Sequence, residues 1–528
     1  MSNYYIMKTY QYLFGLALST ILICSSCSKD FLTLYPEGNL NEGTFYKTEA
    51  DFQQAVMGAY TPLRDIANNA FWMDEMRSDN ATFDYFEKDR GSAARENISS
   101  FMDDATNGVT LIRYQANFIG VNRANAILDH IDGASISDSI KNQVIGEAKA
   151  LRGHYYFDLV KTFGGVPLQL HEILKTDDAY LPRATADEVY TQIISDLKDA
   201  LNLLPAPKFT AGETGRINKG VVATELAAVY MQKKDYASAI PLLQSVATMG
   251  YSLMTNFKDI FNPANKSASA NKELIFDVQY QSGTTGQSSS FIYRFIPNTP
   301  TTTLFLGTGV NFNVNGFGGW NVPTDNLIAL FETGDTRLDA SIGVAEGNLN
   351  SSQDFIASKL VSAVGYVAPP GVKVKYFCKK FYYPPYPNLN QNTDQNWTLY
   401  RYADVLLMLA ECLNETNKPG EALPYVNQVR TRAFGNSTRN ITTSDQAGLR
   451  NAIAQERRLE LAFENKRWYD LIRTGEAITV MNAYGITAKA KFPYLLPQSF
   501  NITENRLVYP IPQRETELNK KLVQNLGY

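Results

Sequence analysis

Apolar residues recur every three or four positions along several stretches of the chain, which is the spacing of one buried helical face. Between residues 147 and 163 the spacing is kept by Ala148, Leu151, Tyr155, Leu159 and Phe163. Gly164 and Gly165 follow directly, and glycine is a poor residue for a helix interior. The pattern predicts a helix over 147–163.

A second predicted helix carries its own start signal. Thr185 is followed three residues later by Glu188, which is the spacing of a capping box. Apolar positions then continue at helical spacing through Val189, Ile193, Leu197, Leu201 and Leu204. Pro205 comes next and cannot continue the helix, so the prediction ends there.

Small and aromatic residues alternate over residues 220–243, where Ala227 and Ala228 precede Tyr230 and Tyr236. Small residues let two helices approach, and an aromatic ring from one fills the space beside the other, as in a tetratricopeptide unit. Similar pairs occur over 404–413 with 419–429, and over 449–473. The pairs are separated by insertions, so no strict repeat length is predicted.

Between about residues 262 and 396 the chain changes to Gly, Ser, Thr, Asn and Pro with interleaved aromatic residues. Residues 274–280 and 373–377 are rich in β-branched and aromatic residues and predict short strands. The rest of this insert is predicted to be loop. Loops of this length inside a compact protein are usually functional, so the search for a ligand site moves here.

The N-terminus has the pattern of a secretory signal that ends in lipid attachment. Lys8 supplies the positive start, residues 13–23 the apolar centre and residues 25–26 the small residues before Cys27. Eleven such residues are too few to span a bilayer as a helix. We predict lipidation at Cys27, with Cys24 as the rival position and an ordinary buried first helix as the alternative.

Composition favours a large folded body after that signal. Hydrophobic residues make up 44% of the chain and charged residues 19%, while the formal net charge is -4. This charge does not indicate a nucleic-acid-binding surface, which needs clustered Lys and Arg. No uninterrupted apolar run near twenty residues follows residue 27. Cys378 and Cys412 remain, and they are either buried thiols or a disulfide of an exported protein.

Several motifs, spread over almost the full length, carry a family resemblance. They are CSKDFL from Cys27, RANAILDHID at 123–132, GEAKALRGHYYFDLVKTFGGVPL at 146–168, LPRATADEVY at 181–190, GRINKGVVATELAAVYMQKKDYASAI, RYADVLLMLAECLNE, ERRLELAFENKRWYDLIRTG and YPIPQRETELN at 509–519. With these motifs the chain resembles the SusD/RagB-like family, the surface lipoproteins of Bacteroidota that work beside TonB-dependent outer-membrane transporters.

The resemblance implies a mainly α fold in which tetratricopeptide-like helix pairs form a right-handed superhelical scaffold. It implies a signal peptide of residues 1–27 and one SusD-like domain of residues 28–528. The scaffold would occupy about 40–260 and 397–528, and the insert, about 262–396, would hold the ligand. Such a lipoprotein would be anchored at the outer-membrane cell surface, capture oligosaccharides and deliver them to a SusC-like TonB-dependent transporter.

The most charged motifs are predicted to be structural. Opposite charges lie within one or two helical turns of each other at Glu456, Arg457, Arg458, Glu460, Glu464, Arg467, Asp470 and Arg473. We expect these groups, and likewise Arg152, His154 and Asp158, to satisfy one another. They alternate with packing residues such as Leu461 and Trp468 and are not placed in loops, where catalytic groups are expected.

Sugar recognition makes a different demand. A pyranose has an apolar face of C–H groups ringed by hydroxyls, so aromatic rings and polar side chains suit it. Two segments offer this combination, with the candidates Trp72, Asn80, Tyr85 and Phe86 in residues 71–86 and Phe317, Trp320 and Asn321 in residues 311–321. Tyr293 is a candidate outside both segments. We predict a shallow platform around Trp72 and Trp320, against the alternative that both rings anchor their loops on the core. Arg294 and Trp397 are further candidates, and Trp397 is expected in the core.

The sequence contains no motif that announces catalysis. His130, His154 and His171 lie apart without metal-ligand spacing, and there is no phosphate loop or nucleophile elbow. We predict a non-catalytic protein without a resident cofactor, and leave open a Ca²⁺ ion that shapes a loop. Two alternatives stay open: glycoside hydrolysis, which needs only two carboxylates, and capture of a peptide or other nutrient.

Overall fold

The computed structural model describes residues 45–85, 93–307, 309–310, 314 and 317–528. The predicted signal segment, the lipidation site Cys27 and the candidate Phe86 lie outside these residues. Among the described helices, none combines the length and the apolar character that crossing a membrane requires.

The fold is mainly α, as predicted, and its longer helices lie in two parts of the chain. The first part contains α2 (Glu49–Tyr60), α3 (Pro62–Met73), α4 (Ala93–Ser99), α5 (Gly108–His130), α6 (Asp138–Phe163), α7 (Ala186–Leu203), α8 (Lys219–Gln232) and α9 (Tyr236–Ala247). The second part contains α14 (Tyr402–Glu415), α15 (Pro419–Phe434), α16 (Gln446–Glu460), α17 (Arg467–Thr474), α18 (Ala477–Lys491) and α19 (Gln513–Leu518).

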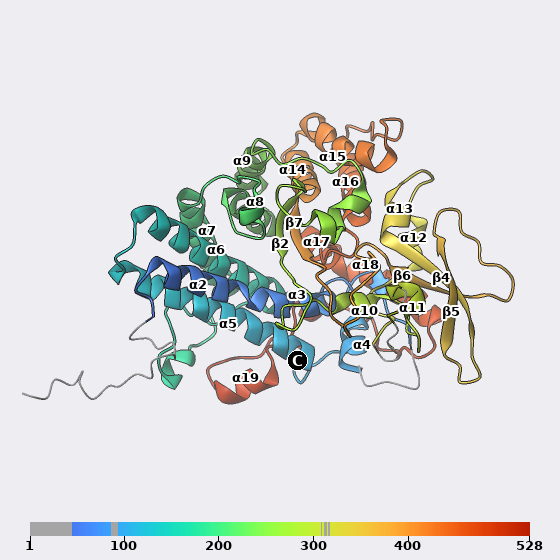
Figure 1. Ribbon diagram of the computed structural model, residues 1–528, viewed down its shortest axis with the longest axis horizontal. Coiled ribbons are helices and arrows are strands. Elements are labelled where there is room, and N and C mark those ends of the chain that lie inside the picture. The colour runs from blue at the N-terminus through green and yellow to red at the C-terminus, as the bar shows by residue number, and fades with distance from the viewer. Residues whose placement is uncertain (1–44, 86–92, 308, 311–313, 315–316) are drawn as a thin grey trace, which may run out of the picture.

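Shorter elements lie mostly between these two parts. The short helices are α10 (Phe291–Phe295), α11 (Thr303–Leu306), α12 (Asp325–Ala329) and α13 (Arg337–Ser341). The strands are β1 (Ala81–Thr82), β2 (Leu274–Val278), β3 (Val322–Pro323), β4 (Ile342–Leu349), β5 (Phe355–Ser362), β6 (Lys373–Cys378) and β7 (Trp397–Arg401). Figure 1 shows the long helices α2, α5, α6 and α7 at one end of the molecule and β4, β5 and β6 at the other.

Consecutive long helices pack against each other in most of the predicted pairs, which confirms the tetratricopeptide-like fold. The pair predicted over 449–473 is the exception, because α16 packs on α14 and α15 and not extensively on α17. The pairs α5 with α6, α6 with α7, α8 with α9, and α14 with α15 make extensive contacts. A Cβ added at Gly120 of α5 would lie 2.2 Å from the ring of Tyr155 on α6, so this approach requires glycine. The capping box of α7 is confirmed, because Thr185 N–H donates to Glu188 Oε2 at 2.8 Å and Glu188 N–H donates to Thr185 Oγ1 at 3.3 Å.

The insert contains more regular structure than the sequence predicted. Strands β2 and β6 confirm the two predicted strands, whereas β4 and β5 fall in residues predicted to be loop. The three strands β5, β4 and β6 form an antiparallel sheet in that order. Gly343 and Gly347 weakened the strand signal of β4, but a Cβ at Gly343 would lie 2.2 Å from the Phe377 ring of β6. Glycine in this strand therefore reflects close packing across the sheet.

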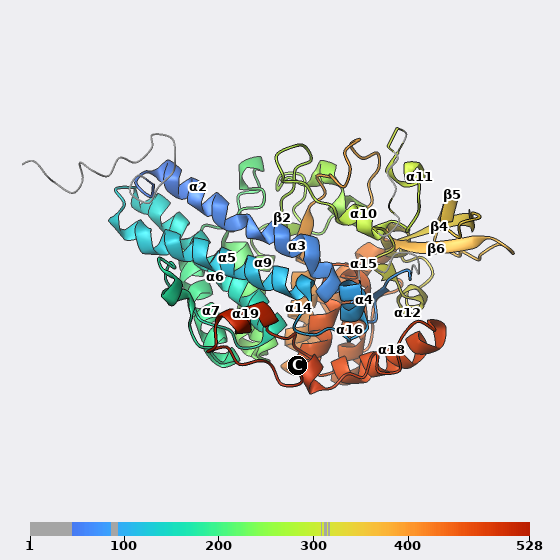
Figure 2. The same ribbon diagram turned by 90° about the horizontal axis from the view of Figure 1, so that it is seen from below.

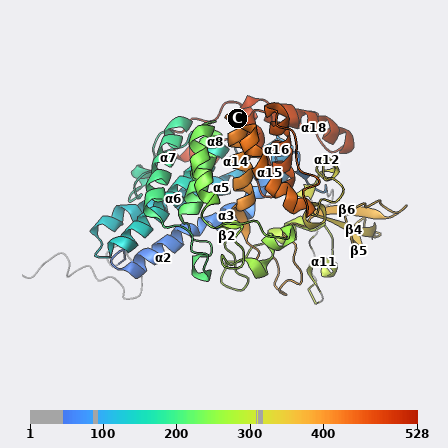
Figure 3. The same ribbon diagram turned by 90° about the horizontal axis from the view of Figure 1, so that it is seen from above.

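The insert begins and ends on one small sheet, which fixes it to the helices. Strand β2 pairs antiparallel with β7, so that Leu274 lies opposite Arg401 and Val278 opposite Trp397. Strand β7 runs directly into α14. Figure 3 shows β2 beside α3 and α14, with the loops of the insert projecting along one edge of the molecule.

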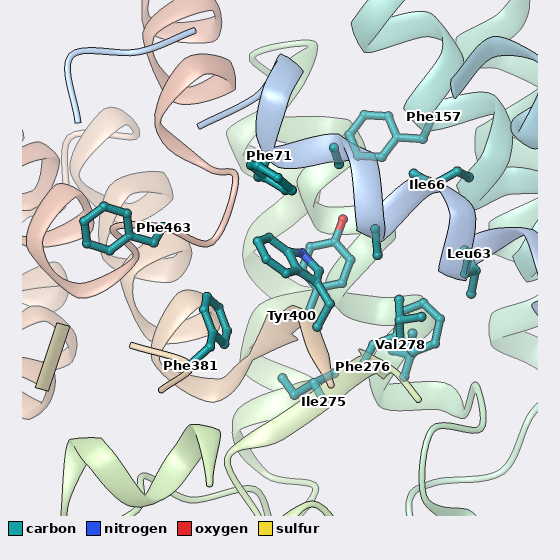
Figure 4. Packing of buried hydrophobic residues seen from close by; sticks show 14 of the residues in the cluster. Leu63, Ile66, Phe71, Phe157, Ile275, Phe276, Val278, Phe381, Tyr400 and Phe463 are labelled. Atoms are coloured by element: carbon teal, nitrogen blue, oxygen red, sulfur yellow. The ribbon is translucent and has the colours of Figure 1, made fainter. Parts of the chain in front are cut away.

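A large hydrophobic core joins most of these elements, and a second cluster contains Trp468 of α17 and Met481 of α18. Figure 4 shows Leu63 and Ile66 of α3 above Phe276 and Val278 of β2. Rings of the large core come from α3, α6, β7 and the loops, and include Phe71, Phe157, Phe381, Tyr400 and Phe463. Trp397, expected in the core, is 1% exposed.

Both described cysteines are buried free thiols. Cys378 lies on β6 and Cys412 on α14, and neither forms a disulfide. Burial raises the pKa of both thiols. The thiolate is the reactive form, so these cysteines act as small apolar core residues.

Candidate functional site

The two aromatic segments chosen from the sequence meet in the structure. Strand β1 follows α3 and pairs antiparallel with β3, so that Ala81 lies opposite Pro323 and Thr82 opposite Val322. This pairing brings the end of α3 beside residues 317–321. The rings of Trp72 and Trp320 are 4.7 Å apart between centroids, with an interplanar angle of 83°. Figure 2 shows α4 beside the end of α3. Helix α10 contacts α3 through Phe295 and Phe71, whose ring centroids are 4.9 Å apart.

The structure does not present these two indoles as an exposed platform. Trp72 is 1% exposed and Trp320 is 6% exposed. Trp72 also packs on Phe71, and Trp320 packs on Phe83. The guanidinium carbon of Arg95 lies 4.4 Å from the Trp72 ring centroid and covers it. The open surface at this cluster is instead provided by Phe317, which is 40% exposed. The ligand-contact role of both tryptophans stays a prediction.

Two other candidates have their polar groups engaged within the protein. Asn80 Nδ2 donates to Glu75 Oε1 at 3.0 Å, and Asn80 Oδ1 accepts from Arg458 Nε at 2.8 Å. The Tyr293 hydroxyl donates to the Leu389 carbonyl at 3.0 Å. Asn80 is 1% exposed and Tyr293 is 0% exposed. In this structure both side chains therefore stabilise the packing around the site.

Tyr85 forms part of the same aromatic region through a residue that sequence reasoning missed. Its ring stacks on Tyr494 at 4.0 Å with an interplanar angle of 9°, and Tyr494 also contacts Phe83 at 5.7 Å. Tyr494 lies after α18, where the sequence KFPYLLP places an aromatic residue between two prolines. That composition was the only local signal, because the contact joins residues about four hundred positions apart.

Asn321 and its neighbour combine burial with polar atoms that lack a partner. Asn321 is 0% exposed and has a φ of 54°, in the left-handed region. Within the described residues, its side-chain amide and the Trp320 Nε1–H have no hydrogen-bond partner. Buried polar groups are nearly always paired, and strained backbone is concentrated at functional sites.

Comparison with known proteins identifies the family. Residues 272–528 match the model of the SusD family, and residues 30–231 match the model described as starch-binding associating with outer membrane. The chain belongs to the SusD/RagB family. SusD-like protein P25 of Formosa agariphila is 27% identical over 96% of this chain and 98% of the relative. The starch-binding protein SusD of Bacteroides thetaiotaomicron is 23% identical over 77% of this chain and 76% of the relative.

Solved structures agree with this family assignment. A laminarin-binding SusD-like protein is 26% identical to this chain and superimposes with a TM-score of 0.72. The match covers 92% of this chain and 100% of that protein. The SusD-like fold therefore includes both the helix pairs and the insert.

The charged SusD/RagB motif around α16 and α17 forms a buried network, as predicted. Arg401 donates to Glu273 Oε1 at 2.9 Å, to Glu460 Oε1 at 2.5 Å and to Glu464 Oε2 at 2.8 Å. These four side chains are at most 1% exposed. Burial acts to raise the pKa of Glu460, but surrounding arginines, chiefly Arg432, hold that pKa below its usual range. The motif stabilises the fold.

Most partners in this network come from other helices and strands, which differs from the predicted pairing within one or two turns. Arg473 does pair with nearby Asp470, at 2.8 Å. Arg152 of α6, however, pairs with Asp196 of α7 at 2.7 Å. Asp158 of α6 pairs with Arg113 of α5 at 2.5 Å. Charged groups that face the interior between helices meet groups on the facing helix, so sequence spacing does not reveal them.

A cavity of about 130 Å³ lies among these charges, between α3, α6, β7 and α17. Lys161 lines it, and its ammonium lies 4.5 Å from the ring centroids of both Phe157 and Tyr469. Burial lowers the pKa of Lys161, although Asp158 and Asp74 act to raise it. The lining holds cations and carboxylates in similar numbers, so its charges compensate one another and belong to the structural network.

Each histidine lies beside a different carboxylate. The pairs are His130 with Glu172 at 2.9 Å, His154 with Glu225 at 2.6 Å and His171 with Asp129 at 3.0 Å. Among the described residues, no group of three or more His, Cys, Asp or Glu is placed to hold a metal ion. A loop-shaping Ca²⁺ ion stays untested.

Proposed function

We propose that this protein captures glycans at the cell surface and delivers them to a SusC-like TonB-dependent outer-membrane transporter, without catalysing a reaction. One observation carries this proposal. The chain is similar over 92% of its length to a laminarin-binding SusD-like protein. The family description of residues 30–231, starch-binding associating with outer membrane, supports the same function and location.

The aromatic region between α3, α4 and α10 is the proposed glycan site. Phe317 offers an exposed ring for the apolar face of a sugar. Tyr85 and Tyr494 extend the aromatic surface beyond the buried tryptophans. The buried polar groups around Trp320 and Asn321 offer hydrogen bonds for hydroxyls at its base.

Glycan capture is tested with the protein that lacks residues 1–27, screened against a glycan array and a pool of peptides. Saturable binding of an oligosaccharide, with no new reducing ends after incubation, is the expected result. Binding of peptides alone would favour the alternative nutrient class. New reducing ends would establish hydrolysis and contradict the non-catalytic proposal.

Replacing Phe317 with alanine should weaken binding of the captured oligosaccharide roughly three- to tenfold, because a sugar face loses its stacking partner. Isothermal titration calorimetry measures the change. Ile486, which is 71% exposed on α18, provides the control, and its alanine variant should bind as the wild type does. Equal affinities of the Phe317→Ala and wild-type proteins would remove this ring from the site.

The proposed anchor is the lipidated Cys27. Cys27→Ala in the full chain should move the protein from the outer-membrane fraction to a soluble fraction, because a surface protein held by acyl chains then loses that tether. Immunoblots of fractionated cells measure this, with Cys24→Ala as the matched control. Co-purification from detergent extracts should recover a TonB-dependent transporter with the wild-type protein.

A further inference from the structure

The guanidinium groups of two arginines lie over the aromatic rings of the proposed glycan site. Arg95 of α4 lies with its guanidinium carbon 4.4 Å from the Trp72 centroid and 5.9 Å from the Trp320 centroid. Arg294 of α10 lies 5.1 Å from the Phe317 centroid. The Trp320 backbone N–H donates to the Arg294 carbonyl at 2.9 Å, which holds Arg294 beside Trp320.

The two positive charges lie close enough to repel each other. Burial first, and then the charge of Arg95, lower the pKa of Arg294 to about 10. Burial also lowers the pKa of Arg95. Within the part of the chain that the structure describes, no carboxylate forms an ion pair with Arg294. The nearby Asp84 instead pairs with Lys375 at 2.9 Å. A half-buried cation is costly without an opposite charge, so this position favours an anionic group.

A second observation at the same place concerns hydrogen-bond donors. Trp320 Nε1–H and the Asn321 amide are buried without a partner among the described residues. Trp320 belongs to the ring pair that Arg95 covers. The N–H donors of Trp320 and Asn321, together with the guanidinium N–H groups of the arginines, suit a ligand group with several acceptor oxygens. The net charge of the chain is -4, so attraction of an anion must come from this local group of charges.

We propose that Arg294 and Arg95 bind the carboxylate or sulfate group of an acidic sugar, so that the captured glycan is anionic. This inference rests on the proposed glycan-binding function and specifies its ligand class. The planar guanidinium donates two parallel hydrogen bonds to the oxygens of a carboxylate or sulfate. Phe317 lies beneath Arg294 and offers its ring to the apolar face of the same sugar. Charge and stacking then act on one residue of the glycan.

Matched pairs of oligosaccharides test the proposal. The protein without residues 1–27 is titrated with an oligogalacturonate and with the same oligosaccharide after reduction of its carboxyl groups. A sulfated carrageenan oligosaccharide and its desulfated form make the second pair. At least one anionic member should bind tenfold or more tightly than its neutral partner. The pair that shows this difference identifies the recognised group as a carboxylate or a sulfate.

Variants assign that preference to the arginines. Arg294→Gln should weaken binding of the anionic member at least tenfold and leave the neutral member within twofold. Arg294→Lys keeps the positive charge but loses the paired N–H donors, so it should lose less affinity for the anionic member than Arg294→Gln does. It replaces the glutamine variant in the test if that variant does not fold. Arg439→Gln, on an exposed side chain after α15, should match the wild type. Thermal unfolding midpoints of all variants are measured in parallel.

The outcomes separate this inference from the proposed function. Equal affinity for charged and neutral members, or an unchanged anionic affinity in Arg294→Gln, overturns the anionic site while leaving glycan capture intact. Binding of peptides with no binding of any oligosaccharide, on the array or in these titrations, overturns the proposed function and this inference together.

Discussion

Replacing Arg401 with methionine should lower the free energy of unfolding by about 3–5 kcal/mol, because it leaves buried carboxylates without their central cation. Glu273, Glu460 and Glu464 all accept from this guanidinium, and none of these side chains is more than 1% exposed. Arg432 still contacts Glu273 and Glu460, so the network is weakened and not abolished. Urea unfolding followed by tryptophan fluorescence measures the difference.

Arg450 provides the matched control for this substitution. It also pairs with a glutamate, Glu415, at 2.6 Å, but its side chain is 47% exposed. Exposed pairs contribute little, so Arg450→Met should change the free energy of unfolding by no more than about 1 kcal/mol. Similar losses in the two variants would contradict the view that burial makes the Arg401 network important.

The helical scaffold was predictable because its signals are local. The capping box of Thr185 and Glu188 and the spacing from Val189 to Leu204 both lie within one helix, and α7 follows them closely. Strand β4 was not predicted, because Gly343 weakens its strand pattern and the packing of Gly343 on Phe377 is visible only in the structure. A packing contact between two strands produces no periodic pattern in the sequence of either strand.

The sequence indicated the two segments of the candidate site but not how their side chains pack. Aromatic and amide residues suggested the segments around Trp72 and Trp320, and pairing of β1 with β3 brings them together. Sequence alone could not show that the two indoles pack on each other, nor that Arg95 covers Trp72. Arg95 stands in an ordinary polar stretch, so its relation to the rings depends wholly on tertiary structure.

Raising the pH from 4.5 to 8 should cost the wild-type protein about 3 kcal/mol of unfolding free energy relative to Glu75→Gln. Glu75 is 0% exposed. Burial raises its pKa from the usual 4.5 to about 7, although hydrogen bonds from Asn80, Phe463 and Asn465 act in the opposite direction. The folded protein therefore binds a proton that the unfolded chain releases at lower pH. The resulting stabilisation is fully present below about pH 4.5 and is lost as the pH rises through about 7.

The glutamine variant isolates this contribution because it keeps the shape of the side chain without a titrating group. It also loses the acceptor for the Asn465 N–H, which lies 2.9 Å from Glu75 Oε2, but that cost does not vary with pH. Glu421→Gln, at a side chain that is 60% exposed, controls for removing one carboxylate. Unfolding free energies at half-unit pH steps give the difference curve. A wild-type curve parallel to that of Glu75→Gln from pH 4.5 to 8 would show that folding leaves the pKa of Glu75 unchanged.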